Sequence, residues 1–113
     1  MVAYVISDVE PRDAGLIERY RDLAQGSIAR YGGRYIVRGG PVETIEGDWT
    51  PTYLVIIEFP DIDRAHQWYR SEAYAEALTV AERVLSRRLV FVEGASATQQ
   101  MSQPDTSPWA ERA

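Results

Sequence analysis

The sequence predicts a single α+β domain in which four strands and two helices follow one another in the order β-α-β-β-α-β. Stretches rich in β-branched and aromatic residues alternate with stretches whose apolar residues recur every three or four positions. The length of 113 residues suits one domain with one core. A hydrophobic share of 45% and a charged share of 26% are typical of globular chains, so we expect the protein to fold.

The first strand is predicted over residues 2–9, and Pro11 ends it because proline has no N–H group for the sheet ladder. Asp13 then offers a side-chain oxygen that can cap a helix. This helix is expected to run to about Tyr31, because its apolar residues share one face. They are Leu16, Ile17, Tyr20, Leu23, Ala24, Ile28 and Tyr31.

Two further strands are predicted to form a hairpin after the glycine pair 32–33, which can end the first helix in a left-handed conformation. The second strand covers residues 34–44, and the Gly-Gly-Pro sequence at 39–41 predicts a bulge within it. A turn is expected at 46–51. Residues 53–59 then form a β-branched run that a proline closes.

A second helix is predicted to begin at Asp61, and Ser71 is expected to interrupt it and to cap its continuation. Its inward residues are Ala65, Trp68, Tyr69, Tyr74, Leu78, Ala81 and Leu85. Residues 89–92 form a last short strand. Residues 95–113 lose all periodicity and gain Ser, Thr, Gln and Pro, so we expect a polar tail that is extended or disordered after a domain at 1–94.

This order of elements is the ferredoxin-like arrangement. Two right-handed crossovers interleave to give one four-stranded antiparallel sheet with the helices on one face. The other face stays uncovered although its strands are apolar, and contiguous exposed apolar surface usually marks an interface. We therefore expect a homodimer that forms through the sheet faces.

The composition argues against several classes of function. A formal net charge of −5 and a pI near 4.8 do not suit nucleic acid, whose phosphates are bound by clustered cations. The chain has no cysteine and one histidine, so we expect neither a disulfide nor a metal site. The first ten residues contain no basic segment and no long apolar run, which predicts a cytoplasmic protein without a membrane partner.

Five separated motifs agree in order and spacing with those of a known family. They are YGGRYIVRGG at 31–40, EGDWTP at 46–51, IEFPD at 57–61, WYRSEAY at 68–74 and LVFVEG at 89–94. Over residues 2–94 the chain therefore resembles the family called domain of unknown function 1330, for which no reaction is established.

That resemblance implies the dimeric α+β barrel superfamily, in which two ferredoxin-like sheets pack into a barrel and each subunit keeps a pocket between sheet and helices. Members include cofactor-free quinone-forming monooxygenases, muconolactone isomerase, polyketide cyclases and haem enzymes, so the fold implies no single reaction. We expect no cofactor. The axial ligand of the haem enzymes is normally a histidine, and the only one here, His66, lies on the second predicted helix. A glycine-rich phosphate-binding motif is also missing from the sequence.

An ion pair between Arg38 and Glu58 is predicted from the strand pattern. Glu58 is the one acid in the apolar run 53–59, and a hairpin that turns about Asp48 places Arg38 directly across from it. A buried carboxylate needs such a partner. Two interpretations stay open: the pair fixes the register or holds the dimer, or Glu58 moves a proton while Arg38 binds an anionic or carbonyl group of a substrate.

Asp8 is the second candidate base. It shares one side of the first strand with Tyr4 and Ile6, and the first and third strands are neighbours in this topology. Asp8 and Glu58 are therefore expected to approach each other on one face and to shift each other's proton affinity. Alternatively, Asp8 is a solvated residue at the end of a strand.

Aromatic residues and the single histidine complete the predicted ligand-binding set. Tyr20, Trp68 and Tyr69 either pack in the core or line the pocket. His66 either takes part in acid–base chemistry or is a surface residue of an amphipathic helix. Trp49, in the predicted turn, is expected to cover the partner subunit or the mouth of the pocket.

Two functions stay open on these observations. The first is a cofactor-independent isomerase, cyclase or monooxygenase-like enzyme for a small aromatic or carbonyl-bearing metabolite, with Glu58 or Asp8 as base and Arg38 as electrostatic clamp. The second is a non-catalytic dimer that binds a small ligand or serves as an accessory or structural module. An enclosed pocket containing Arg38, together with a carboxylate of raised pKa, favours the first function, whereas a fully packed barrel favours a structural role.

Overall fold

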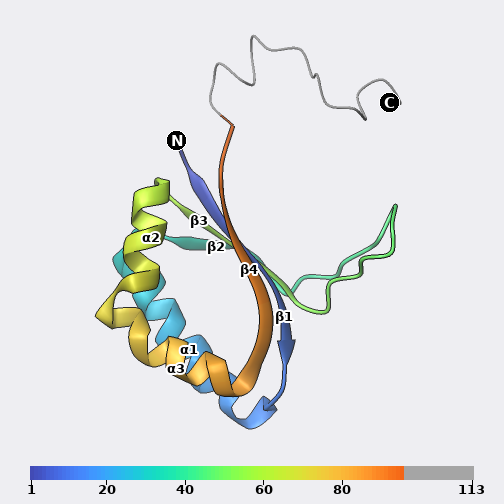
Figure 1. Ribbon diagram of the computed structural model, residues 1–113, viewed down its shortest axis with the longest axis horizontal. Helices are drawn as coiled ribbons and strands as arrows, with labels where there is room; N and C mark the ends of the chain where they lie inside the picture. The colour runs from blue at the N-terminus through green and yellow to red at the C-terminus, as the bar shows by residue number, and fades with distance from the viewer. Residues whose placement is uncertain (96–113) are drawn as a thin grey trace.

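A computed structural model describes residues 1–95 of the chain. Nearly all of the predicted polar tail, including Trp109, lies outside the described residues. Seven helices and strands follow one another along the described part (Figure 1). They are β1 (Ala3–Pro11), α1 (Ala14–Arg30), β2 (Arg34–Arg38), β3 (Leu54–Phe59), α2 (Ile62–Arg70), α3 (Glu72–Val84) and β4 (Leu85–Glu93).

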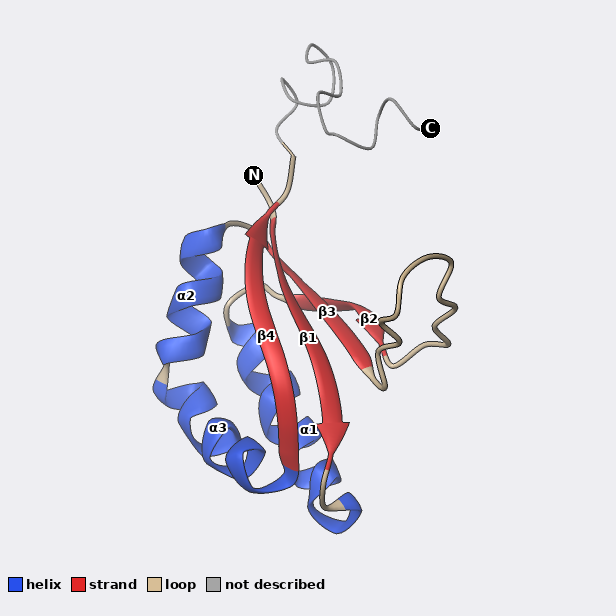
Figure 2. Ribbon diagram, turned by 45° about the vertical axis from the view of Figure 1, so that its right-hand side comes forward, coloured by secondary structure: helices blue, strands red, loops and turns tan. Residues whose placement is uncertain are grey.

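The four strands form one antiparallel sheet in the order β2-β3-β1-β4. All three helices lie on one side of this sheet, and the opposite side carries no helix (Figure 2). The predicted ferredoxin-like α+β fold is therefore confirmed. We call the side that the helices cover, which includes Val5 and Ser7 of β1, the covered face; the side that includes Ile6 and Asp8 is the open face.

Side-chain caps set the starts of the helices as the sequence predicts. Asp13 caps α1 and Asp61 caps α2 by accepting hydrogen bonds of 3.0 and 2.7 Å from backbone N–H groups. Ser71 has an extended backbone and its Oγ accepts a bond of 3.1 Å from the N–H of Tyr74, so α2 ends and α3 begins at this residue. The predicted interruption of the second helix is confirmed.

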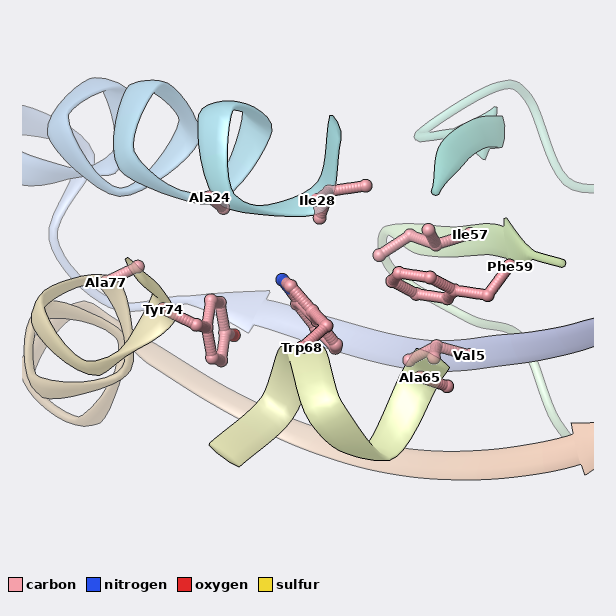
Figure 3. Packing of buried hydrophobic residues seen from close by; sticks show 9 residues of the cluster. All are labelled: Val5, Ala24, Ile28, Ile57, Phe59, Ala65, Trp68, Tyr74 and Ala77. Atoms are coloured by element: carbon pink, nitrogen blue, oxygen red, sulfur yellow. The ribbon is translucent and has the colours of Figure 1, made fainter. Parts of the chain in front are cut away.

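The core lies between the covered face and the helices, with Trp68 as its largest buried side chain (Figure 3). The ring centroid of Trp68 is 4.3 Å from that of Tyr74 and 5.4 Å from that of Phe59. Its indole Nε1 donates a hydrogen bond of 3.0 Å to Oγ of the buried Ser27. Aromatic packing therefore fills the centre of the domain, and the buried indole N–H has its acceptor.

The pairing of β2 with β3 differs from the predicted register. Arg34, and not Arg38, lies opposite Glu58. The predicted pairing of Arg38 with Glu58 is therefore wrong. It assumed a short turn about Asp48, whereas residues 39–53 form a long loop that extends away from the sheet (Figure 2). A loop of that length does not fix the register as a two-residue turn does.

A β-bulge in β2 decides which face Arg38 occupies. Tyr35 lies opposite Ile57 of the covered face. Arg38, three residues later, lies opposite Val55, which is also on the covered face. Strict alternation would place two residues at this spacing on opposite faces. The register shift between Tyr35 and Val37 inserts one residue and so returns Arg38 to the covered face.

Strand β4 begins earlier than predicted, at Leu85 directly after α3, and it pairs with β1 along the whole of that strand. The placement of Leu85 in a helix is therefore wrong. The nine residues of β1 offer a pairing edge as far as Pro11, which lies opposite Leu85. As a result Arg87 is a strand residue on the covered face, between Leu85 and Leu89.

Candidate ligand-binding cavity

A cavity of about 50 Å³ lies between the covered face and α1. Its apolar walls include Val5, Val9, Val55, Ile57, Leu85 and Leu89. Its polar walls are Ser7, Tyr20, Arg21, Tyr35, Arg38, Tyr53 and Arg87. The whole chain has 17 acids against 12 basic residues, yet among the described residues the lining contains three arginines and no carboxylate. The cavity is therefore a positively charged site in an acidic protein.

Arg87 lies in a closed triangle of hydrogen bonds with two tyrosines. Its Nη1 donates a bond of 2.8 Å to the hydroxyl of Tyr20, and its Nη2 donates one of 2.8 Å to the hydroxyl of Tyr74. The two hydroxyl oxygens are 2.9 Å apart, so they share a third hydrogen bond. Strand β4, helix α1 and helix α3 each supply one member, which ties the helices to the sheet beside the cavity.

The other two arginines of the cavity lie over tyrosine rings. Cζ of Arg38 is 4.4 Å from the ring centroid of Tyr35, a cation–π contact. Cζ of Arg21 is 5.6 Å from the ring of Tyr53, and its Nη2 donates a bond of 3.3 Å to the Tyr53 hydroxyl. Arg21 also forms an ion pair with Glu18, with 2.8 Å between Nη1 and Oε1. Arg38 and Arg87 therefore supply the cavity with its uncompensated positive charge.

The protonation of these groups follows from burial and from their neighbours. Burial raises the pKa of Tyr35 to about 12, with a smaller contribution from Tyr20. Burial also raises the pKa of Tyr74. Burial by itself would lower the pKa of Arg87, but the two tyrosines that it contacts outweigh this effect and raise it. At neutral pH these two phenols are uncharged and the guanidinium is charged.

Asp8 and Glu58 lie on the open face, away from the cavity. Glu58 forms an ion pair with Arg34, 3.1 Å between Oε1 and Nη2, and Asp8 accepts a hydrogen bond of 2.9 Å from Nε1 of Trp49. Glu58 lies opposite Tyr4, which is roughly 13 Å from Asp8 along an extended strand. The prediction that the two acids approach each other is therefore wrong, because the antiparallel register separates them by four positions.

The aromatic candidates and His66 divide among the cavity, the edge of the core and the surface. Tyr20 and Trp68 line the cavity, whereas Tyr69 and His66 do not. The Tyr69 ring packs 6.0 Å from the rings of Trp68 and of Phe91. His66 is an exposed residue of α2, and its ring lies 5.0 Å from that of Phe91. The structure thus brings together Tyr20, Trp68 and Arg38 of the predicted residues.

Sequence comparison settles the family. The family model described as a domain of unknown function, DUF1330, matches residues 2–95. The chain belongs to the DUF1330 family. A comparison with curated proteins gives no match.

Three solved structures share the fold of this DUF1330 protein. A protein of unknown function from Rhodopseudomonas palustris has a TM-score of 0.69 at 18% identity, covering 84% of this chain and 83% of its own. A dimeric ferredoxin-like protein of unknown function from a Jannaschia species has a TM-score of 0.61 at 15% identity, covering 83% and 100%. SnoaB, a cofactor-independent oxygenase from Streptomyces nogalater, has a TM-score of 0.58 at 13% identity, covering 85% and 94%. These similarities support the fold.

The described part of this DUF1330 chain holds no recognisable metal centre. Within residues 1–95, no group of three or more His, Cys, Asp or Glu side chains could hold a metal ion. The helices of the same region include none that is long and apolar enough to cross a membrane.

Arg87 and Tyr35 are cavity residues that the sequence pattern did not predict. Arg87 lies between Leu85, the last inward residue of the predicted second helix, and the predicted strand at 89–92, so the pattern assigns it to neither element. One signal was present: Leu85, Arg87 and Leu89 alternate with Ser86 and polar neighbours at the period of a strand. An arginine on the apolar side of such a strand points to a site.

Proposed function

We propose that this DUF1330 protein binds a small molecule in the cavity between its sheet and its helices, and that it does so as a homodimer. The single observation that carries the proposal is the composition of the cavity wall. Guanidinium and hydroxyl groups converge there over an apolar floor, which is the usual composition of a small-molecule site.

The cost of placing Arg87 in the cavity supports a binding role. A guanidinium that leaves water loses hydration, and the hydroxyls of Tyr20 and Tyr74 return only part of it. A wall that served packing alone would be better filled by an apolar side chain such as those of Leu85 and Leu89 on the same strand. The charge is therefore explained by a ligand that compensates it.

The open face supports the homodimer. Ile6 of β1 lies between Ile56 of β3 and Val90 of β4, so an apolar stripe crosses the sheet on the side without helices. Val90 is 56% exposed and Val92 is 43% exposed. Apolar surface of this kind usually marks an interface, and the similar structure from Jannaschia is described as dimeric. A second copy that packs sheet against sheet would cover the stripe.

A nitrogen-15 NMR titration with a library of small organic molecules tests the binding site. The expected result is that some compounds shift the backbone amides of Ser7, Tyr20 and Arg87, which lie around the cavity, and leave the amide of Ile56 on the open face unchanged. Shifts confined to the open face, or no shifts from the whole library, would contradict the proposal.

A second candidate function is a cofactor-independent reaction in the same cavity. The observation that favours it is the Tyr20 hydroxyl beside the Arg87 guanidinium, a pair of donors that can polarise a carbonyl group. SnoaB, which shares the fold, is described as a cofactor-independent oxygenase. Asp8 and Glu58 have no role in this candidate because they lie on the open face. The Tyr20 hydroxyl and the Arg87 guanidinium would donate to the carbonyl oxygen as the enolate forms, and the proton removed from the adjacent carbon would go to water.

Deuterium exchange at the methyl group of pyruvate in heavy water tests this reaction, because isomerisation, cyclisation and oxygenation of carbonyl compounds all begin with removal of an adjacent proton. The enzyme hypothesis predicts exchange above the uncatalysed rate that Tyr20→Phe abolishes and Glu58→Gln leaves intact. Exchange at the uncatalysed rate, with pyruvate bound in the cavity, would contradict the enzyme hypothesis and support binding without catalysis.

A further inference from the structure

The hydrogen-bond triangle around Arg87 leaves one hydroxyl proton unused. Each tyrosine oxygen accepts one N–H group from Arg87, and the two hydroxyls share one further bond. Two hydroxyls carry two protons, and one bond between them uses only one. The remaining proton belongs to Tyr20 or to Tyr74, and burial decides between them.

Tyr74 donates within the triangle, so the unused proton is on Tyr20. Tyr74 is fully buried, and its hydroxyl bonds only to Tyr20 and Arg87 among the described residues. If Tyr20 donated to Tyr74, the proton of Tyr74 would be buried without an acceptor, which folded proteins avoid. With Tyr74 as donor, the O–H group of Tyr20, which lines the cavity, is free to donate to a ligand.

Ser7 provides a second free hydroxyl from the floor of the same cavity. The residue is only 5% exposed, and its hydroxyl forms no hydrogen bond with another described residue. No fully buried polar side-chain atom of the described chain lacks a partner, so this oxygen is reached through the cavity and not sealed in the core. A polar group placed in this way points to a ligand as its partner.

The charge of the cavity calls for an anion. The ion pairs among the described residues involve Arg19, Arg21 and Arg34, so neither Arg38 nor Arg87 has a carboxylate partner. The ligand's negative charge would replace that partner. A planar carboxylate matches the guanidinium fork and can also accept hydrogen bonds from neighbouring hydroxyls.

The size of the cavity limits the anion. The volume of about 50 Å³ is smaller than the roughly 150 Å³ cavity that accepts benzene, so an aromatic ring does not fit inside it without movement. The carboxylate head group of a short acid is smaller than a ring and suits this volume. Arg38 is the exposed arginine of the lining and so marks a side on which the cavity reaches solvent, where a longer ligand would extend outward.

We propose that the ligand is a short carboxylate whose head group accepts hydrogen bonds from the Arg87 guanidinium and the Tyr20 hydroxyl, with its carbon chain on the apolar floor. This inference rests on the proposed binding function and adds the chemical class of the ligand. Arg38 adds a second positive charge at the solvent side, and Ser7 adds a hydroxyl from the floor. The apolar remainder of the wall disfavours phosphate, which needs donors on all sides.

An NMR titration with three matched probes tests the class. Propionate is the short carboxylate, propionamide has the same shape without the charge, and inorganic phosphate is an anion without the carbon chain. We expect propionate to shift the cavity amides with a millimolar dissociation constant and propionamide to bind about tenfold to hundredfold more weakly, as the loss of a charge-assisted hydrogen bond implies.

Variants assign the contact to its residues. Arg87→Gln and Tyr20→Phe are expected to weaken the binding of propionate about tenfold or more. The controls Arg83→Gln and Tyr31→Phe change the same chemical groups away from the cavity and are expected to leave the propionate affinity unchanged. If Arg87→Gln does not fold, Arg87→Lys and Tyr20→Phe decide the question, because the lysine keeps the charge and loses the fork.

Each result has one meaning. Propionamide binding in the cavity as tightly as propionate, or phosphate binding more tightly, would overturn the carboxylate inference and leave the binding function standing. Equal propionate affinity in wild type and Tyr20→Phe would overturn the assigned contact. A cavity that responds to none of the three probes, nor to the compound library, would overturn the inference and the binding function together.

Discussion

The two faces of the sheet handle charge in opposite ways. On the open face, Glu58 is paired with Arg34 and Asp8 accepts a hydrogen bond from Trp49, so each acid has its partner within the chain. On the covered face, Arg38 and Arg87 have tyrosines as neighbours and no acid. Charges that are satisfied within the chain need no ligand, whereas those of the covered face do. The proposed binding residues are therefore the ones left without a counter-charge.

The largest difference in unfolding free energy is expected between two tryptophan substitutions, one behind the covered face and one beside the open face. Trp68→Ala should lower the free energy of unfolding by about 3–5 kcal/mol, because it opens a cavity in the centre of the core. Trp49→Ala should lower it by less than about 1 kcal/mol, because Trp49 is 57% exposed and its side chain makes one hydrogen bond. Urea unfolding of both variants measures the difference. Equal losses would show that the long loop is part of the core.

The second-largest effect is expected on the open face, when a substitution introduces a charged residue into the apolar stripe. Val90→Asp should raise the dissociation constant of the proposed homodimer by at least about a hundredfold, because an unpaired carboxylate would be buried against the partner. Sedimentation equilibrium measures this, with Gln67→Asp on exposed α2 as the control that adds the same charge elsewhere. A wild-type chain that is already monomeric at micromolar concentration would refute sheet-to-sheet assembly.

On the covered face, removal of one hydroxyl from the Arg87 triangle is expected to cost less than the Trp68 change. Tyr74→Phe should lower the unfolding free energy by about 1–3 kcal/mol, because Nη2 of Arg87 loses its acceptor. Tyr31→Phe, whose hydroxyl forms no hydrogen bond within the described chain, is the matched control and should be close to neutral. If the two variants lost equal stability, the triangle would have no energetic role.

The smallest effect is expected on the way the free energy of unfolding changes at alkaline pH. The pKa of Tyr35 is raised from 10.0 to about 12 by burial, so the folded chain keeps a proton that the unfolded chain releases. The contribution of Tyr35 to stability is therefore complete below about pH 10 and is lost as the pH rises toward about 12. Unfolding curves across that range should fall less steeply for Tyr35→Phe than for wild type. Identical slopes would mean that Tyr35 ionises at its ordinary pKa.

Local sequence signals predict most of the fold because they depend on neighbours in the chain. Asp13, Asp61 and Ser71 are capping residues immediately before apolar helical patterns, and each begins a helix. The length of β4 depends instead on a distant partner. The segment 85–88 has one apolar residue and three polar residues, and only pairing with the long edge of β1 makes it a strand.

The candidate site is harder to predict because one inserted residue changes the face of a strand. The sequence pattern predicts Arg38 opposite Glu58, whereas Arg38 lies opposite Val55 and lines the cavity. The sequence at 35–38, Tyr-Ile-Val-Arg, contains no glycine or proline that would indicate the bulge. Asp8 and Glu58 are predicted site residues because they are acids in apolar strands, but only their pairing partners reveal which charges are left uncompensated.

The most direct measurement for the covered face is a crystal structure with 3-bromopropionate, a short carboxylate whose bromine can be located by anomalous scattering. Because no carboxylate of the described chain pairs with Arg87, we expect an anomalous peak inside the cavity, with the carboxylate in contact with the Arg87 guanidinium and the Tyr20 hydroxyl. A cavity without density, combined with a peak beside Arg34 on the open face, would contradict the assignment of the ligand site to the covered face.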